Sequence, residues 1–377
     1  MRRKKLVFLS VFCFFAIQVQ GCIAISIKTN PYLTGLKQTE NSFIKEKTLP
    51  EFFNIPRSLP DIKFNELIDQ DRKFSTQKFS FKSWKNTEYP KNDTITGTLY
   101  LPKKSENRDL FIIIPGTAED KSAAFVSEVL AGLGYRAIRI DSGFRPLPKK
   151  FIEVLAESTD TTSAFNNASD FMVNAMQQRI IDLMRLNDFW EISMNPTGLK
   201  VHVIGISLGG IIGSLLSVTD TRVQSLMMIN SSAGIARILM DSKMSGFMPF
   251  RNSLMKKLGL SYQEAYLLIK EKLKEIEPIT YASRFNGKKI LIVSGGIDMI
   301  SFIDTAIPYS STKETWEAFG KQEWIIMPFA GHVSSFISLL PFWLEFPNPI
   351  DLIYTFIIDN SYAAHLIKNH FLPMALK

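Results

Sequence analysis

The sequence predicts an α/β fold, with a doubly wound, mainly parallel sheet and helices on both faces. Two observations lead to this prediction. Short, almost wholly apolar runs recur between residues 110 and 327, as expected for strands buried on both faces. Segments with apolar residues at helical spacing separate several of these runs, and alternating strands and helices are typical of parallel sheets.

The first residues predict an export signal that lies outside this fold. A basic block, Arg2 to Lys5, precedes the apolar run Leu6 to Ile17. As a helix this run would be about 18 Å long, which is short of the hydrocarbon core of about 30 Å. We therefore interpret residues 1–21 as a signal peptide. A buried helix or an uncleaved anchor is the alternative.

The end of this segment resembles the lipobox of bacterial lipoproteins. It reads Val19-Gln20-Gly21-Cys22, with Gln20 where a small residue is usual and valine in place of the commoner leucine. The resemblance implies that Cys22 carries lipid and that the exported protein is anchored to a membrane of the cell envelope. Cleavage after Ala24 would instead give a soluble periplasmic or secreted protein. Either product keeps at most one cysteine, so we expect no internal disulfide.

Charge and composition narrow the function classes. The chain has 46% hydrophobic and 21% charged residues, which is ordinary for a globular protein with a sizeable core. Four positive charges lie in residues 1–21, so the net charge falls from +8 to +4 without them. This excess of positive charge is small and dispersed along the chain, so no nucleic-acid partner is expected.

The elements follow in order along the chain. Residues 22–77 are mixed and interrupted by prolines, and we interpret them as a tether and N-terminal extension. Residues 78–377 form the main domain. Strands are predicted at 94–102, 110–114, 136–140, 200–204, 223–229, 290–293 and 324–327, and helices at 121–133, 168–190, 211–218 and 262–276. Residues 233–284 interrupt the alternation as a helical insertion, which could form a lid over a site or a packing elaboration.

Gly205-Ile206-Ser207-Leu208-Gly209 matches the G-x-S-x-G nucleophile elbow. In such an elbow the serine lies on a sharp strand-to-helix turn, and side chains two positions away on either side would collide there. Given 20 glycines, a chance match arises about once in ten chains of this composition. The predicted strand before the motif and the helix after it favour Ser207 as a nucleophile over a glycine turn used only for packing.

A serine hydroxyl needs a base, and the chain has only four histidines. His202 lies inside a predicted strand, and His365 and His370 lie in the last helical segment. His332 directly follows the last strand, at the strand end where sites form in such sheets. We therefore predict His332 as the base.

The base in turn needs a carboxylate to orient it. Asp298 follows the strand at 290–293 in the turn Ser294-Gly295-Gly296-Ile297-Asp298. Asp304 is the competitor, but we expect it inside the following helix. We therefore predict Asp298 in this role.

The order Ser207, Asp298, His332 resembles the α/β-hydrolase family, whose triad runs in that order. The resemblance covers about residues 80–355 and extends to the esterase and dienelactone-hydrolase-like branches through the doubled glycine of GISLGG. It implies an oxyanion hole formed by the backbone N–H of Leu208 and a second N–H after an early strand, from Thr117 or Ala118. Here Pro115 replaces the family's usual histidine.

These observations predict a serine hydrolase that cleaves an acyl ester, or an amide, of a small-molecule substrate. A weakly active or inactive hydrolase-fold binding or scaffold lipoprotein, and an acyltransferase, are the alternatives. We expect no metal and no cofactor, because the sequence has neither an HExxH motif nor a phosphate-binding glycine loop.

Overall fold

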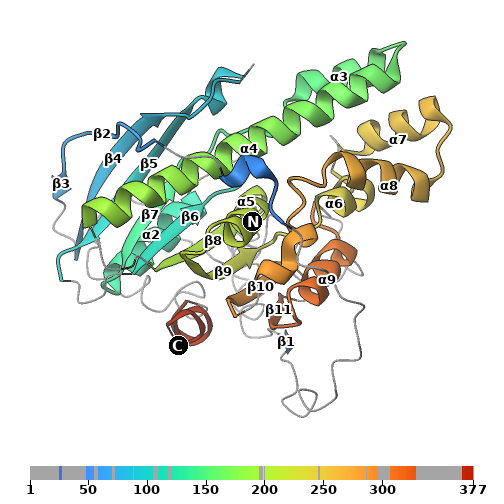
Figure 1. Cartoon of the computed structure of the whole chain (residues 1–377). Coiled ribbons are helices and arrows are strands. Elements are labelled where there is room, and N and C mark those ends of the chain that lie inside the picture. The colour runs from blue at the N-terminus through green and yellow to red at the C-terminus, as the bar shows by residue number, and fades with distance from the viewer. Residues whose placement is uncertain are drawn as a thin grey trace, which may run out of the picture.

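In the computed structural model, one large β-sheet runs through the molecule and helices cover both of its faces (Figure 1). The structure describes residues 25–27, 48–54, 58–69, 73–87, 89–104, 109–117, 121–194, 198, 200–244, 247–285, 287–295, 306–327 and 367–376. The eleven strands in these ranges are ordered β1-β11-β10-β9-β8-β6-β7-β5-β4-β2, with β3 paired to β4. Their bounds are β1 Ile25–Ile27, β2 Lys63–Phe64, β3 Ile68–Asp69, β4 Phe74–Lys82, β5 Thr94–Pro102, β6 Leu110–Ile114, β7 Arg136–Ile140, β8 Val201–Ile206, β9 Val223–Ile229, β10 Lys289–Gly295 and β11 Glu323–Met327.

The middle of the sheet is parallel, which confirms the predicted fold class. Six strands pair in parallel with one another, in the order β7, β6, β8, β9, β10 and β11. β5 is antiparallel to both β4 and β7, and β1 is antiparallel to β11. Because parallel strands end at the same edge, the carboxyl ends of β6, β8, β9, β10 and β11 all lie at that edge.

Four predicted strands have the observed bounds residue for residue, namely β5, β6, β7 and β9. Their neighbours β8, β10 and β11 are somewhat longer than predicted. The wholly apolar runs arise because each central strand faces two cores. In β6, Ile112 and Ile114 pack into the core on one face of the sheet, whereas Phe111 and Ile113 pack into the core on the other.

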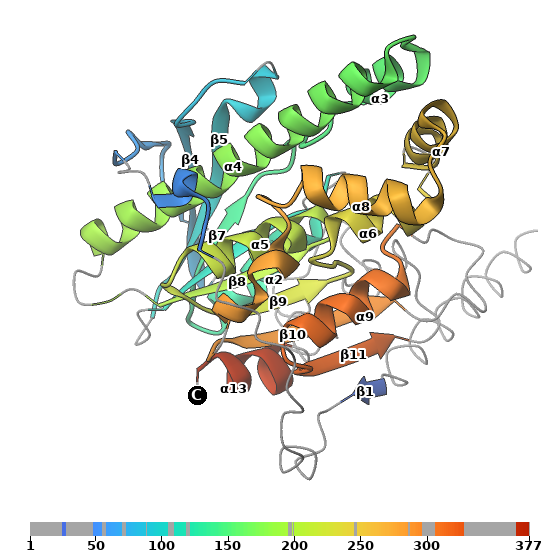
Figure 2. The same ribbon diagram turned by 45° about the vertical axis from the view of Figure 1, so that its right-hand side comes forward.

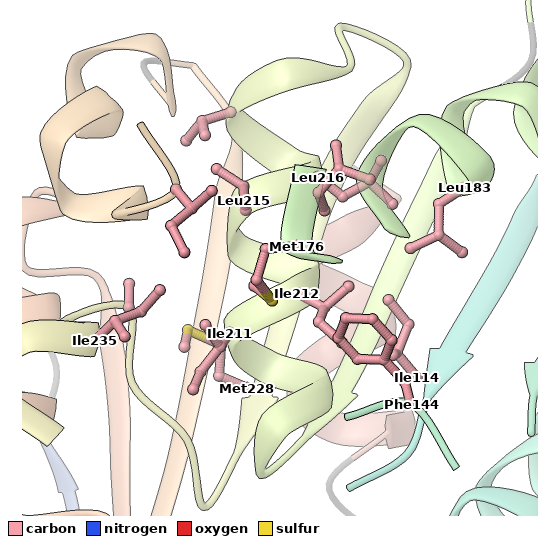
Figure 3. Close-up of a cluster of buried hydrophobic side chains, with 14 of the residues drawn as sticks. Ile114, Phe144, Met176, Leu183, Ile211, Ile212, Leu215, Leu216, Met228 and Ile235 are labelled. Carbon is pink, nitrogen blue, oxygen red and sulfur yellow. The ribbon is translucent and has the colours of Figure 1, made fainter. Parts of the chain in front are cut away.

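Different helices cover the two faces. α4 (Thr161–Met194) and α5 (Leu208–Thr219) contribute to the core on one face. α2 (Lys121–Gly132) and the C-terminal elements η5 (Ile367–Phe371) and α13 (Leu372–Ala375) contribute to the core on the other (Figures 1 and 2). Figure 3 shows side chains of α4, such as Met176, and of α5, such as Ile212, packed in one apolar layer with Ile114 of β6.

The predicted helical insertion lies between β9 and β10. It consists of α6 (Ile235–Asp241), α7 (Phe247–Leu258), α8 (Tyr262–Lys272) and the 3-10 segment η4 (Pro278–Phe285). Phe250 of α7 contacts Phe165 of α4, with ring centroids 6.2 Å apart. Lys257 Nζ donates to the carbonyl oxygens of Ala156, at 2.8 Å, and Ser158, at 2.7 Å, at the end of α3 (Lys149–Glu157). The insertion therefore rests on α3 and on the first turns of α4.

Two helices differ from the sequence-based expectation. α4 extends beyond the predicted 168–190 at both ends, and its first turns are held by buried Ala164 and Phe165. α9 (Tyr309–Ala318) has no clear apolar period, because its buried face carries the hydroxyls of Ser311, Thr312 and Thr315. These hydroxyls are buried together with their hydrogen-bond partners, so a polar helix face is stable there.

The predicted tether, residues 22–77, contains short elements at both ends of the sheet. β1 pairs with β11 at one edge, and β2 and β3 pair with β4 at the other. Between them η2 (Glu51–Asn54) places Phe52 against Trp84, with ring centroids 5.8 Å apart. Of the helices in the described ranges, none is both long and apolar enough to cross a bilayer.

Candidate active site

Ser207 lies on a sharp turn between β8 and α5. It has a φ of 53° and a ψ of −119°, a backbone region that residues other than glycine rarely adopt. Such a conformation costs roughly 1–3 kcal/mol and persists only where the surrounding structure imposes it. Ser207 is partly exposed, at the edge of the sheet where the parallel strands end. The predicted strand–turn–helix context of the motif is therefore confirmed.

The two glycines of the motif allow this turn to pack closely. A Cβ atom on Gly205 would collide with the backbone of Gly209, whose carbonyl carbon would lie 2.6 Å away. A Cβ atom on Gly209 would overlap the carbonyl oxygen of Ile114 and come within 2.7 Å of the carbonyl oxygen of Pro115. The collisions predicted from the motif would thus be with backbone atoms, which cannot rotate away.

The loop after β6 lies directly beside Ser207. A Cβ atom on Gly116 would be 3.2 Å from Ser207 Cβ and 3.7 Å from Ser207 Oγ. Thr117, the predicted second oxyanion donor, is the next residue and is exposed. Leu208 begins α5, where the first N–H groups have no acceptor within the helix. The structure thus brings the loop of Thr117 next to Ser207, while Ala118 lies outside the described residues.

Gly116 and Ser231 also lie beside Ser207, and neither belongs to the predicted site residues. A Cβ atom at Gly116 would make a tight contact with Ser207 Cβ. Ser231 follows β9, and its Oγ donates to the backbone carbonyl of Ser207 at 2.6 Å. The signal for Ser231 was its place after a strand at the same edge, in Asn230-Ser231-Ser232. This stretch holds no carboxylate, so the requirement for a triad acid does not point to it.

A serine, a histidine and an aspartate come together elsewhere in the sheet, away from Ser207. His202 Nδ1 is 2.8 Å from Ser225 Oγ, and His202 Nε2 is 3.4 Å from Asp109 Oδ2. These residues lie at the amino ends of β8, β9 and β6, so they are at the edge opposite Ser207. Ser225 and His202 are fully buried, and Phe111 stacks on the His202 ring. His202 is therefore packed in the sheet body, as expected, and no substrate can reach this serine.

His370 also lies away from Ser207. Its Nδ1 is 2.9 Å from Glu323 Oε1, at the amino end of β11. Both histidines in the described ranges thus contact groups at the amino ends of strands. The other predicted site residues, Asp298, His332 and Cys22, lie outside the described residues, as do Asp304 and His365.

The carboxyl end of β9 is joined directly to the elbow, and the carboxyl end of β10 is joined to the residue that follows β9. The Ser207 N–H donates to the Ile229 carbonyl at 2.9 Å, and the Asn230 N–H donates to the Val293 carbonyl at 2.7 Å. The strand that leads toward Asp298 is therefore two strands from β8, and the strand that leads toward His332 is three strands away. Within the described ranges, no three potential metal-ligating side chains gather at one point.

Solved structures share this architecture. Acetyl xylan esterase 1 from Thermoanaerobacterium sp. JW/SL YS485 superposes with a TM-score of 0.50 and 13% identity, covering 83% of this chain and 92% of that one. An acetyl xylan esterase from Paenibacillus sp. R4 superposes with a TM-score of 0.51 and 15% identity, covering 74% and 85%. No family model and no curated protein matches the sequence. The chain has an α/β-hydrolase fold.

Proposed function

We propose that the protein is a serine hydrolase that cleaves a carboxylic ester of a small molecule through Ser207, His332 and Asp298. The observation that supports this most is the Ser207 backbone, held at a φ of 53° on a strand-to-helix turn. Strain of this kind tends to occur at functional sites, where the rest of the fold sustains it. The esterases among the fold neighbours favour an ester over an amide.

In the first half of the reaction, His332 takes the proton of the Ser207 hydroxyl as Oγ attacks the acyl carbonyl. The negative charge that develops on the carbonyl oxygen is bound by the N–H groups of Leu208 and Thr117. His332 then gives its proton to the leaving alcohol as the carbon–oxygen bond breaks. The acyl group remains on Ser207.

In the second half, water attacks the acyl-enzyme and His332 takes a proton from it. Collapse of the second tetrahedral intermediate returns that proton to Ser207 and releases the carboxylic acid. Asp298 holds the His332 ring in one tautomer and stabilises its protonated form. An acyltransferase would use the same residues but would deliver the acyl group to another acceptor.

The lengths of the segments that follow β10 and β11 support the assignment of Asp298 and His332 as partners of Ser207. Neighbouring strands lie about 4.8 Å apart, so the ends of β10 and β11 are about 10 Å and about 14 Å from that of β8. Asp298 comes three residues after Gly295, the last residue of β10, and His332 five residues after Met327, the last of β11. Extended segments of these lengths span about 10 Å and about 17 Å. Both side chains can therefore reach the edge at Ser207.

We further propose that the protein is exported and held at a membrane of the cell envelope by lipid on Cys22. The basic block, the apolar run and the Gly21-Cys22 pair support this location. The substrate would then be met outside the cytoplasm.

A fluorophosphonate probe tests the proposed nucleophile. We expect the purified protein to be labelled, and the Ser207→Ala and His332→Ala variants to lose labelling and ester hydrolysis by about 10³-fold or more. Ser225→Ala is the matched control, because it removes a serine that contacts His202 at the opposite edge of the sheet. The labelled fraction and the release of acid from a p-nitrophenyl ester are measured on folded protein.

Two results would contradict the proposal. One is a wild-type protein that folds but is not labelled, as an inactive scaffold protein would be. The other is equal labelling of the Ser207→Ala variant. Release of free carboxylic acid in the presence of alcohol or amine acceptors supports a hydrolase, and complete transfer to such an acceptor contradicts it.

A further inference from the structure

We infer that Ser231 is a positioning residue for the oxyanion hole, and that it acts through the Ser207–Leu208 peptide. This inference rests on the proposed function. Ser231 is fully buried, and its Oγ donates to the carbonyl oxygen of Ser207 at 2.6 Å. The N–H of Gly210 donates to the same carbonyl oxygen at 2.9 Å. Two donors therefore hold one carbonyl group.

The consequence follows from the planarity of the peptide unit. The Ser207 carbonyl and the Leu208 N–H belong to one peptide group, so fixing the direction of the carbonyl also fixes the direction of the N–H. The Leu208 N–H is the donor that we place in the oxyanion hole. Hydrogen bonds accepted by the carbonyl also polarise the peptide, which makes its N–H a stronger donor.

The backbone after β9 places Ser231 for this contact. Asn230 has a φ of 46°, which turns the chain sharply at the end of the strand. Asparagine tolerates this left-handed region better than most residues. The Asn230 N–H is held by the Val293 carbonyl of β10 at 2.7 Å. The turn is thus anchored to the next strand, and Ser231 is directed back at the elbow.

The contact also explains the second glycine of the GISLGG sequence. A Cβ atom on Gly210 would collide with both Oγ and Cβ of Ser231. The G-x-S-x-G motif alone does not require a glycine at this position. Gly210 leaves the space that the Ser231 side chain occupies.

Ser232 provides a matched comparison. It is equally buried, but its hydroxyl contacts Thr315 Oγ1 at 2.8 Å and the Ser311 carbonyl at 2.9 Å, both in α9. Removing either hydroxyl deletes a buried hydrogen bond, and only that of Ser231 reaches the peptide beside the nucleophile. An effect on fold stability alone would appear in both variants.

The test compares Ser231→Ala with Ser232→Ala in steady-state ester hydrolysis, with active sites counted by the fluorophosphonate probe. Loss of an oxyanion donor outright costs about 10²–10³ in kcat. Because Gly210 still binds the carbonyl, we expect Ser231→Ala to lower kcat per active site about tenfold. KM should stay within about twofold of wild type, because the contact acts in the transition state. Ser232→Ala should keep the wild-type kcat.

A second variant keeps the inference testable if Ser231→Ala does not fold. Ser231→Cys retains a side chain of similar size with a weaker donor, so its kcat should fall between those of wild type and Ser231→Ala. Wild-type kcat in both Ser231 variants would overturn the inference, and so would an equal loss in Ser232→Ala. A wild-type protein without labelling would instead overturn the proposed function, so the two failures are distinguishable.

Discussion

At the scale of single residues, the elbow requires glycines, because Cβ atoms at these positions would contact their neighbours too closely. At Gly205 and Gly209 a Cβ atom would collide with backbone atoms, and at Gly116 it would make a tight contact with Ser207 Cβ. Backbone clashes cannot be relieved by a side-chain rotation, so Gly205 and Gly209 do not tolerate even a methyl group. The strain of Ser207 is sustained by this packing and by its hydrogen bonds to the end of β9.

Gly209→Ala tests this packing. The new methyl group would overlap the Ile114 carbonyl and force β6 and α5 apart, so we expect the free energy of unfolding to fall by about 3 kcal/mol or more. Gly132→Ala is the control, since a Cβ there would meet nothing within 4 Å and alanine favours the helix. Denaturant unfolding measures both, and similar midpoints for the two variants would refute the packing argument.

At the scale of elements, a buried carboxyl group holds the start of the inserted helices. Glu277 Oε2 accepts the N–H groups of Ile235 at 3.1 Å and Ala236 at 3.3 Å, in the first turn of α6. Burial raises the pKa of Glu277 to about 8, outweighing the effect of these two donors. The neighbouring Glu314 carboxylate raises this pKa further, whereas Lys270 lowers it. The anchor of α6 is thus protonated at neutral pH.

This shift predicts that the protein loses stability as pH rises. Glutamate in the unfolded chain ionises near pH 4.5, whereas folded Glu277 keeps its proton up to about pH 8. The unfolded state therefore binds fewer protons between these values, and the free energy of unfolding falls as pH rises through this window. Glu277→Gln imitates the protonated acid, so it should match wild type near pH 5 and be more stable near pH 8, by a few kcal/mol.

Unfolding midpoints in denaturant at the two pH values measure this difference. Glu271→Gln is the control, because that side chain is exposed on α8 and should not change the pH dependence. A Glu277→Gln variant with the same pH dependence as wild type would show that this carboxyl group does not titrate as described.

At the scale of the whole molecule, the N-terminal region reaches both edges of the sheet. β1 covers the outer edge of β11, and β2 and β3 cover β4 at the far end. Edge strands expose unpaired backbone groups that can pair with other chains, so covering them limits aggregation. Arg185 of α4 adds a contact to the same region, since its Nε donates to the Ser58 carbonyl at 2.9 Å.

Partition between detergent and aqueous phases tests the proposed anchor of the molecule. We expect the full-length protein, expressed with its export signal in a bacterial host, to enter the detergent phase, because acyl chains gain about 0.8 kcal/mol per buried CH₂ group. Cys22→Ala should move it to the aqueous phase. Cys13→Ala, within the predicted signal, should partition like wild type. A Cys22→Ala protein that stays in the detergent phase would rule out lipid on this residue.

The local pattern of apolar residues was sufficient to predict the elements whose side chains pack in the core. Strands such as β6 and β9 are buried on both faces, so their apolar runs marked their bounds without further information. The elbow was likewise predicted from the sequence, because its glycines avoid clashes with residues a few positions away and with one neighbouring strand. The apolar pattern did not predict α9, because its buried face is built from hydroxyl groups that bond to residues 232–234, which lie far away in the sequence.

The tertiary structure decided which distant residues surround Ser207. Strand order places β6 and β9 on either side of β8, and so brings Gly116 and Ser231 to the elbow. No sequence period carries that information, because it depends on how strands pair across separations of about 25 to 90 residues along the chain. It also places His202 away from Ser207, near the amino end of β8 at the opposite edge of the sheet. Apolar pattern determines the elements, whereas the order of strand pairing determines which polar groups can act together.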